Sequence, residues 1–586
     1  MARKSVEEIK GESRGLRGRL AQDLADHNKP AFDEEEAQLL KFHGAYQQDN
    51  RDTRLERRKQ KLDKEWIYMV RTKCPGGDLT AAQYLALDRL VDELGWGALR
   101  ITSREGLQLH GVSKMNLKQV IRRINEAGVT TRGACGDVVR NTMAPSAPLA
   151  DAVHRDAQAL ARRISEAFLW KSTAYVEIWC NGEKADVPEW NDARADAAEP
   201  LYGRFYLPRK FKFAIAVPPR NDVDVYANDV GIVPHFPNGE VEGYTILVGG
   251  GMGMAHGVQE THPALAQPLF YVRKQDIMAA ATAIVQVQRD HGRRDDRRQA
   301  RLKYLIRDRG LQWFREQVLE RLPDVSVEPP RPLHWETVGD LLGWHEQGDG
   351  RLFVGIYVQD GRIKDEAGGG PRWKSALRRI AESFGFPIRL TANTNILFYN
   401  IAPEQRDAVD AVLREHGLAG PEALTLARRM SQACVALPTC GLALTESERV
   451  FAGIMDQLDR VLRELGLERE PILVRMTGCP NGCARPYNAD IAFVGRAPGQ
   501  YAVFAGGHHA GTRLVRLQHK QVALEELVAT VRPWLEDFAR NRLEGESFSE
   551  FWGRTRLAGA GATAPPDPSE FHVEAAAAVA DPAPRD

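Results

Sequence analysis

The chain of 586 residues has no run that approaches the ~20 consecutive apolar residues of a membrane-spanning helix. Its first ten residues, MARKSVEEIK, carry charges where a secretory signal has its apolar stretch, so we expect no signal peptide. Basic and acidic residues both number 79, and a formal net charge of zero argues against a general nucleic-acid or membrane-surface binder. These absences predict a cytoplasmic protein with no membrane partner and no nucleic-acid partner.

Cysteine is also scarce, with seven residues in the whole chain. An odd and sparse set does not form the framework of a disulfide-stapled protein. Cys74, Cys135 and Cys180 have no evident role and are expected to be buried or bystander thiols. The other four crowd into the last third of the chain, which indicates a metal or iron–sulfur site.

These four cysteines form two segments, CVALPTC (434–440) and TGCPNGC (477–483). Proline and glycine make both segments loops, whose backbone N–H groups are available to sulfur. Four thiolates can hold a cubane iron–sulfur cluster, and the five-residue gap of the first pair favours a cluster over structural zinc. A zinc-stabilised binding protein, a non-catalytic electron carrier and a set of unligated core cysteines stay open as alternatives.

Two pairs of segments repeat in the same order along the chain. ALDRLVDELGWGALRIT (86–102) is similar to ALRRIAESFGFPIRLT (376–391), and GYTILVGGGMG (243–253) is similar to QYAVFAGGHHAG (500–511). The first pair is an amphipathic helix, a glycine turn and a strand, and the second is a short apolar strand that runs into glycines. The repeat predicts an ancient duplication, with two α+β halves that each pack a sheet on helices.

A basic strand is predicted around residue 100, in LRITSREGLQLHG. Alternate residues of a strand share a face, so Arg100, Thr102 and Arg104 fall together, and Gln108 and His110 follow in the same way. The opposite side is apolar. Because buried cations need anionic partners, this face is expected to bind an anion.

A second basic strand is predicted at YLPRKFKFAIAV (206–217), with Lys210 and Lys212 on one face and Arg209 on the other. Two like charges side by side repel each other unless an anion sits between them. Further cations stand at Arg71, at Arg140 and in the stretch 288–305. Together with the cysteines, they indicate a polyanionic redox cofactor and a small anionic substrate.

The combination of R-x-T-x-R, Q-x-H-G, PRKFK, CVALPTC and TGCPNGCARP resembles the siroheme-dependent sulfite and nitrite reductases, from about residue 5 to about residue 558. FHGAYQQDNRD (42–52) and GWHEQGDG (343–350) look more like the sulfite-reducing branch. The resemblance implies an α+β fold of two duplicated halves, with ferredoxin-like half-domains and two siroheme- or cluster-binding α+β domains. The implied domains are an N-terminal arm (1–65), a first half-domain (66–143), a first siroheme-binding domain (144–330), a second half-domain (331–430), a cluster- and siroheme-binding domain (431–558) and a disordered tail (559–586).

The resemblance also implies a role for each motif position. Cluster ligands are expected at Cys434, Cys440, Cys479 and Cys483, and Cys483 is also expected to bridge to the siroheme iron. Siroheme contacts are expected at Arg100, Thr102, Arg104, Gln108, His110 and Arg209. The open face of the iron is expected to be ringed by Arg71, Arg140, Lys210 and Lys212.

The expected reaction is the six-electron reduction of sulfite to sulfide by an assimilatory enzyme. Arginine keeps its proton and lysine has a labile one, so Arg71 and Arg140 are assigned to anchoring, and Lys210 and Lys212 to proton donation. Siroheme-dependent reduction of nitrite to ammonia is the alternative on the same scaffold. The electron donor is expected to be an NADPH flavoprotein subunit or a ferredoxin.

Overall fold

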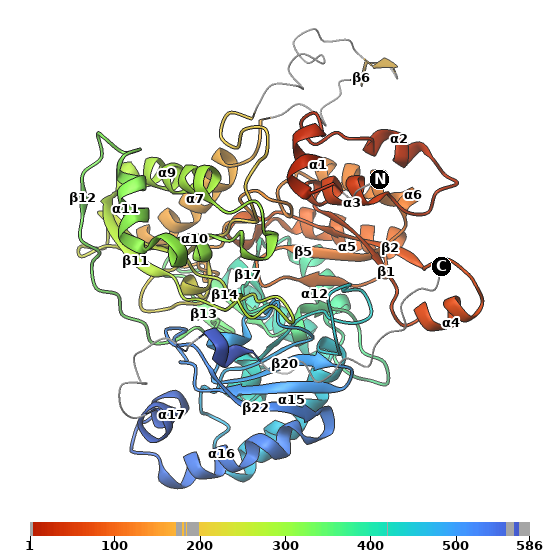
Figure 1. The fold of residues 1–586 in the computed structure, drawn as a ribbon. Coiled ribbons are helices and arrows are strands. Elements are labelled where there is room, and N and C mark those ends of the chain that lie inside the picture. The colour runs from red at the N-terminus through yellow and green to blue at the C-terminus, as the bar shows by residue number, and fades with distance from the viewer. Residues whose placement is uncertain are drawn as a thin grey trace. The chain divides into compact units, whose positions relative to one another are not determined.

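The computed structural model describes residues 4–171, 179–180, 183–184, 199–418, 420–557, 566 and 568–572. The chain forms two compact units (Figure 1). Unit 1 comprises Met1–Gly251, Ala266–Thr425 and the short segment Pro438–Gly441, and unit 2 comprises Met252–Leu265, Leu426–Leu437 and Leu442–Asp586. Among the described residues, no helix is long and apolar enough to cross a membrane.

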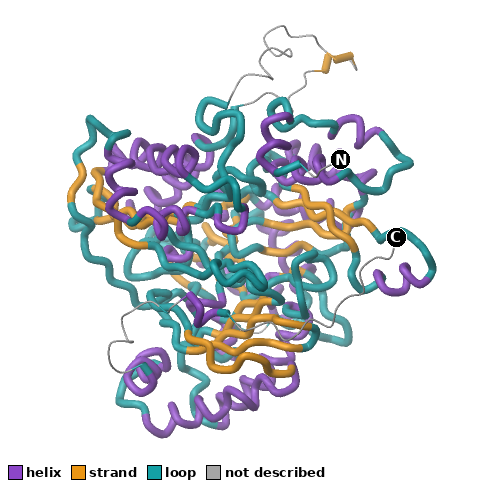
Figure 2. The backbone as a smooth tube through the Cα atoms, in the orientation of Figure 1, coloured by secondary structure: helices purple, strands orange, loops and turns teal. Residues whose placement is uncertain are grey.

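The first sheet of unit 1 has five antiparallel strands in the order β1-β2-β5-β4-β15. Strands are drawn orange in Figure 2. The strands are β1 (Ala45–Asp49), β2 (Trp66–Arg71), β5 (Leu107–Val112), β4 (Leu99–Ile101) and β15 (Arg362–Ile363). Helices α5 (Ala81–Leu94) and α6 (Lys114–Glu126) contact its strands. The Thr80 side chain and the Gln83 side chain cap the first turn of α5 reciprocally, which fixes where that helix begins.

The second sheet of unit 1 repeats this plan, in the order β13-β14-β17-β16-β3. The strands are β13 (Gly343–Glu346), β14 (Leu352–Ile356), β17 (Ile396–Ile401), β16 (Ile388–Leu390) and β3 (Asp78–Leu79), and the helices are α12 (Trp373–Phe384) and α13 (Arg406–Glu415). The two halves exchange an edge strand: β15 of the second half pairs with β4, and β3 of the first half pairs with β16. Neither sheet is complete without the other half.

The paired helices of the two halves also contact each other. Arg378 on α12 forms ion pairs with Asp88 and Asp92 on α5, and Lys374 reaches the same two carboxylates. Asp88 is fully buried, so its charge is compensated at this contact rather than by water. The exchanged strands and this helix pair make the two half-domains one interlocked body.

The third sheet of unit 1 has the order β12-β11-β10-β9-β8, in which β8 and β9 are parallel and the other pairs are antiparallel. The strands are β8 (Phe213–Ile215), β9 (Val230–His235), β10 (Gly243–Val248), β11 (Gln267–Arg273) and β12 (Val327–Glu328). Its helices are α7 (Ala152–Ala167), α9 (Ile277–His291), α10 (Leu302–Arg309) and α11 (Leu311–Leu319).

Unit 2 is built on a fourth sheet with the order β18-β19-β20-β21-β22. The strands are β18 (Gln432–Ala433), β19 (Val474–Thr477), β20 (Ile491–Ala497), β21 (Gln500–Ala505) and β22 (Arg516–Ala523), and the helices are α14 (Leu426–Met430), α15 (Glu448–Glu464), α16 (Leu527–Asn541) and α17 (Phe548–Arg556). On α15, Phe451, Met455, Leu458 and Leu462 recur at helical spacing and are buried. A parallel pair followed by an antiparallel ladder and a long helix repeats the third sheet, so the predicted duplicated α+β fold is confirmed.

The ends of the chain differ from expectation. The segment 1–65 contains helices α1 (Val6–Glu12), α2 (Leu20–Ala25), α3 (Glu34–Leu40) and α4 (Arg54–Lys59). It also contains β1, which joins the first sheet through the register Ala45↔Val70. The boundary placed at residue 66 therefore falls inside that sheet.

The tail predicted to be disordered from residue 559 is ordered at 568–572. Phe571 is buried and lies edge-on to Tyr487 at 5.8 Å between ring centroids, and the His572 ring bonds the Thr261 carbonyl at 2.6 Å. Burial of the apolar Phe571 side chain favours an ordered segment here, although the composition of the tail predicted disorder. The remaining tail residues lie outside the described part of the chain.

Candidate cofactor site

A row of polar side chains crosses the first sheet at one level. The register pairs Arg71 with Gln108, Gln108 with Arg100, and Arg100 with Arg362. Directly paired residues project from the same face, so four neighbouring strands present these side chains together. Arg100 and Gln108 were predicted here; Arg362 was not, because it arrives on the exchanged strand β15 from the other half.

His110 lies two residues beyond Gln108 on the same face and contacts the same arginines. Arg362 Nη1 lies 3.3 Å from His110 Nδ1. Since a guanidinium only donates, Nδ1 accepts. Burial, reinforced by Arg362, Arg100 and Arg71, lowers the pKa of His110 well below its usual value. Because Nδ1 accepts from Arg362, the proton of the imidazole lies on Nε2.

The predicted strand face 100–104 ends at Ile101. Thr102 and Arg104 lie in a turn, in which the Thr102 hydroxyl accepts the backbone N–H groups of Arg104 and Gly106, each at 3.2 Å. The Arg104 guanidinium donates to Asn228 Oδ1 at 2.5 Å and to the Phe213 carbonyl at 2.9 Å. Arg104 thus reaches the start of the third sheet instead of lining the strand, because a three-residue strand gives way to a hydroxyl-stabilised turn.

Arg71 lies beside a thiol and a phenol that the sequence did not assign. Its Nη1 donates to Cys135 Sγ at 3.3 Å, and its guanidinium lies 5.9 Å from the centre of the Tyr46 ring. With the Gln108 amide turned, Oε1 accepts from Arg71 Nε at 3.0 Å. Burial is the main cause of the raised pKa of Tyr46, and Arg140 and Arg71 oppose it. The two predicted anchors, Arg71 and Arg140, therefore act on one phenol.

Arg140 is fixed by the loop that precedes it. Its Nε donates to the Gly136 carbonyl at 2.8 Å and its Nη1 to the Ala134 carbonyl at 3.1 Å, while its backbone N–H donates to Phe211 at 2.8 Å. Gly136 has φ +88° and Phe42 packs against it, so a side chain at this position would be strained. The loop thereby orients a buried guanidinium.

The predicted strand 206–217 is much shorter, because only Phe213–Ile215 forms β8. Residues 208 and 209 lie in a bend, so strict alternation does not hold before Phe211. Lys210 and Lys212 are nevertheless close enough to interact. Burial first, then Lys210, Arg104 and Arg301, lower the pKa of Lys212 well below its usual value, and Asp229 opposes them.

Arg209 belongs to a separate charge network centred on Asp137. Arg297 binds the Asp137 carboxylate with two bonds of 2.6 and 2.8 Å, Lys10 lies at 3.5 Å, and Arg209 at 4.0 Å. Burial lowers the pKa of Arg209 to about 10, although Asp137 raises it. The carboxylate therefore ties the N-terminal helix α1 to a predicted siroheme contact.

The basic stretch 288–305 supplies two more side chains that the sequence noted only as a group. Arg301 binds Asp229 with two bonds of 2.9 and 2.8 Å, and Lys303 Nζ donates to the Gly251 carbonyl at 3.0 Å. The backbone N–H of Lys212 also donates to Asp229 Oδ2, at 2.9 Å. Spacing along the chain did not reveal these partners, because Asp229 and Gly251 lie 72 and 52 positions earlier in the chain.

Three of the four predicted cluster cysteines belong to unit 2. Cys434 follows β18 and Cys479 follows β19, and since these strands are parallel their carboxyl ends are neighbours. The Gly478 N–H donates to Cys434 Sγ at 3.3 Å, and Asn481 Nδ2 to Cys479 Sγ at 3.5 Å. Cys483 is exposed. Gly482 has φ +63°, and a side chain there would meet the Met252 carbonyl at 2.7 Å.

Cys440 belongs to unit 1, in the segment Pro438–Gly441. No disulfide joins the four cysteines within the described part of the chain. Sulfur atoms that accept N–H groups in glycine-containing loops are the donor set that an iron–sulfur cluster uses. Burial, with neighbouring cations adding to it, lowers the pKa values of Lys212 and Arg209, and cations in such a setting suit a cofactor with several carboxylates. Both predicted cofactors thus fit the residues that are present.

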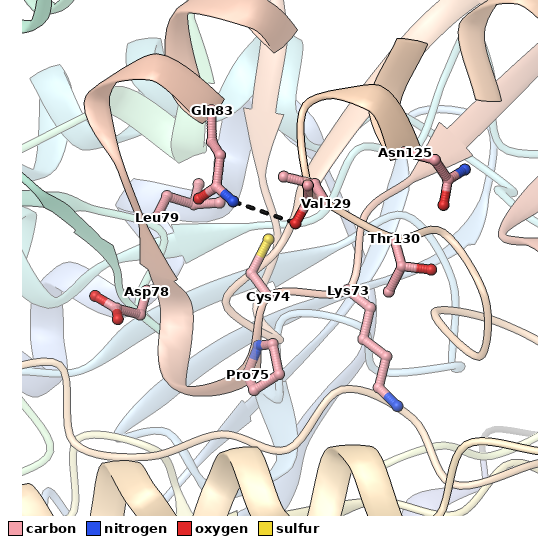
Figure 3. A pocket seen from close by; sticks show the side chains of 10 residues that line it. Lys73, Cys74, Pro75, Asp78, Leu79, Gln83, Asn125, Val129 and Thr130 are labelled. Atoms are coloured by element: carbon pink, nitrogen blue, oxygen red, sulfur yellow. Dashed lines mark hydrogen bonds between the residues drawn. The ribbon is translucent and has the colours of Figure 1, made fainter. Parts of the chain in front are cut away.

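A cavity of about 370 Å³ lies beside the start of α5, near the end of α6 (Figure 3). Lys73 is at its edge, but its Nζ donates to the Ser165 carbonyl at 3.0 Å, and Figure 3 shows the side chain directed away from Gln83. Burial raises the pKa of the Cys74 thiol to about 12. The cavity holds none of the predicted site residues. The side chain of Cys180 lies outside the described residues.

The chain belongs to the nitrite and sulfite reductase family. The family model described as the nitrite and sulphite reductase 4Fe-4S domain matches residues 142–325, and the model of the nitrite/sulfite reductase ferredoxin-like half domain matches twice, at 59–127 and 345–416. The two matches of the second model coincide with the two strand-exchanged halves. The predicted family and its duplicated architecture are confirmed.

Individual relatives cover nearly the whole chain. The sulfite reductase (NADPH) hemoprotein beta-component of Staphylococcus saprophyticus is 42% identical over 93% of this chain and 94% of its own length. The protein of the same name from Acidithiobacillus ferrooxidans is 43% identical over 97% and 98%. Among solved structures, Mycobacterium tuberculosis NirA matches with a TM-score of 0.75 and 26% identity, over 94% of this chain and 96% of that one.

Proposed function

We propose that this chain is the catalytic hemoprotein subunit of an assimilatory sulfite reductase, which reduces sulfite to sulfide with six electrons. The observation that carries the proposal is a group of neighbouring cations in unit 1, of which Arg301 is buried and Arg104, Lys210 and Lys212 are half-buried. Around Lys212, the cations Lys210, Arg104 and Arg301 outnumber the one acid, Asp229, that acts on the same ammonium. Such a surface is stable only when an anion of similar charge binds to it.

Siroheme, coupled to a 4Fe–4S cluster through Cys483, would supply the iron at which sulfite is reduced, and the six electrons would come from the donor protein through the cluster. Cluster ligands are proposed at Cys434, Cys440, Cys479 and Cys483. Siroheme carboxylates are proposed to bind at Arg100, Thr102, Arg104, Gln108, His110 and Arg209. We add Arg362 to this group, because it completes the row across the first sheet.

The remaining cations are proposed to act on the substrate. Arg71 is oriented by Cys135 and Gln108, and Arg140 by two loop carbonyls, so both offer fixed charges for sulfite oxygens. Each S–O cleavage needs a proton. Lysine has a labile proton and arginine effectively does not. Lys210 and Lys212 are therefore the proposed proton donors.

An NADPH flavoprotein is the proposed electron donor, because the relatives quoted above carry NADPH in their names. The test is an absorption spectrum of the protein from a siroheme-producing host, with iron and acid-labile sulfide measured on the same sample. Siroheme bands and five irons for each four labile sulfides would be expected from the coupled centre. Turnover per KM with sulfite and with nitrite then distinguishes the two substrates, and higher values with nitrite would overturn the proposed specificity.

A further inference from the structure

A rigid turn follows β1 and presents Arg51. Asn50 pairs with Glu65 through backbone and side chain, at 3.0 and 3.1 Å, and the Thr53 hydroxyl donates to the same carboxylate at 2.7 Å. Arg54 closes the turn with two bonds of 2.8 Å to Asp49. These bonds fix residues 50–54 from both sides, so the position of Arg51 is set by the fold of the arm.

Arg51 holds the segment that carries Cys440. Its backbone N–H donates to the Pro438 carbonyl at 3.0 Å, and its Nη1 donates to the carbonyl of Cys440 itself at 3.2 Å. Both contacts lie within unit 1, to which Pro438–Gly441 belongs. The cysteine loop is thus clamped on two carbonyls by a single residue 389 positions earlier in the chain.

We propose that Arg51 is a positioning residue for the Cys440 thiolate, an inference that rests on the proposed role of Cys440 as a cluster ligand. The two hydrogen bonds fix the backbone on which the sulfur is carried. The guanidinium also places a positive charge at the backbone of Cys440, the proposed cluster ligand. A nearby cation stabilises the reduced, more negative state of a cluster, so Arg51 is expected to raise its reduction potential.

The variant Arg51→Gln tests this role in the full chain, and Arg58→Gln is the matched control. Arg58 lies on α4, only seven positions away, is exposed and loses the same charge. The readouts are iron and acid-labile sulfide per chain, the rate of cluster loss to a chelator, and the reduction potential from an EPR-monitored titration. We expect Arg51→Gln to lose its cluster about tenfold faster or more and to titrate at a more negative potential, with Arg58→Gln like wild type.

Arg51→Lys keeps the charge but not the planar donor geometry, so it should hold the potential closer to wild type and still lose the cluster faster. It carries the test if Arg51→Gln does not fold. Equal loss rates and potentials for the Arg51 variants and Arg58→Gln would overturn the inference alone. A wild-type protein without iron and labile sulfide would overturn the proposed function, and this inference with it.

Discussion

The two ferredoxin-like halves share one backbone arrangement and differ in the side chains of one row of residues that are paired across the strands of each sheet. Across the first sheet the paired positions are occupied by Arg362, Arg100, Gln108 and Arg71. Across the second sheet the equivalent positions are occupied by Asp78, Arg389, Leu397 and Gly355. The strand order, exchanged edge strand and register are the same, so the backbone does not dictate the charge of the row. The first row has three arginines, whereas the second has one arginine paired with an aspartate.

In the second half, the charges of the row compensate each other. Its remaining cation, Arg389, lies 3.6 Å from the Asp78 carboxylate, which also accepts the Tyr399 hydroxyl at 2.6 Å. The exchanged strand thus brings an acid to the second row, whereas β15 brings a further arginine to the first. A duplicated fold can therefore carry a row of arginines in one half and an ion pair in the other, through the residues at its edge strands.

The two α+β domains differ in the same way. The residue just before β8 is Lys212, whose N–H donates to Asp229, and the residue just before β19 is Leu473, whose N–H donates to Asp490 at 2.8 Å. The backbone bond is shared, and the side chain is a cation in one copy and apolar in the other. The two domains therefore share the backbone position and differ in the side chain that it carries.

The largest effect is expected from Lys212→Leu. This substitution places at position 212 the residue type that the other α+β domain has at the equivalent position, Leu473. Turnover of sulfite should fall by about 10²–10⁴-fold, as expected for loss of a proton donor, with siroheme and iron content unchanged. Lys210→Met should behave similarly. Steady-state kinetics and the absorption spectrum of the same samples are the measurements.

Lys520→Met is the control for these lysine variants, because Lys520 is exposed on β22. It should turn over at the wild-type rate. Unchanged turnover in both Lys210→Met and Lys212→Leu would remove the lysines from proton transfer. Loss of siroheme from either variant would instead show that its ammonium binds the cofactor.

An intermediate effect is expected from Arg362→Gln, which removes the charge that the second half contributes to the first row. Siroheme affinity should fall by about tenfold, the usual consequence of losing one charged hydrogen-bond partner. The His110 pKa should rise toward its ordinary value, because Arg362 is the largest charge that lowers it. Siroheme content after dilution and gel filtration measures the first effect. Full retention of siroheme would exclude Arg362 from the binding face.

Much of this architecture was predictable because it depends on local patterns. The helix–turn–strand repeat at 86–102 and 376–391 lies in the two half-domains, and proline and glycine predicted the loops that carry the cysteines after β18 and β19. The predicted lengths of two strands were wrong. The strand predicted through Arg104 ends at Ile101, since Thr102 stabilises a turn, and the strand predicted from residue 206 begins only at Phe213, since the chain bends at residue 209. Periodicity gives faces but not where a strand stops.

The missing site residues share a physical reason. Arg362 reaches the row on an exchanged strand, Asp137 gathers cations from α1 and from the stretch 288–305, and Arg51 meets a segment almost 400 positions away. None of these contacts leaves a periodic or spaced signal in the sequence. Strand exchange and long-range ion pairs arise from the tertiary fold alone.

The smallest effect is expected from Arg389→Gln, the second-half counterpart of an Arg100 substitution. Asp78 would lose one cation but keep Arg162 and the Tyr399 hydroxyl, so stability should fall by only about 1 kcal/mol. Siroheme content and turnover should stay at wild-type values, because this row is neutralised within the protein. Urea unfolding followed by circular dichroism measures the first, and the absorption spectrum the second. A clear loss of siroheme from Arg389→Gln would mean that both rows bind the cofactor, and that the two halves diverged less than their side chains indicate.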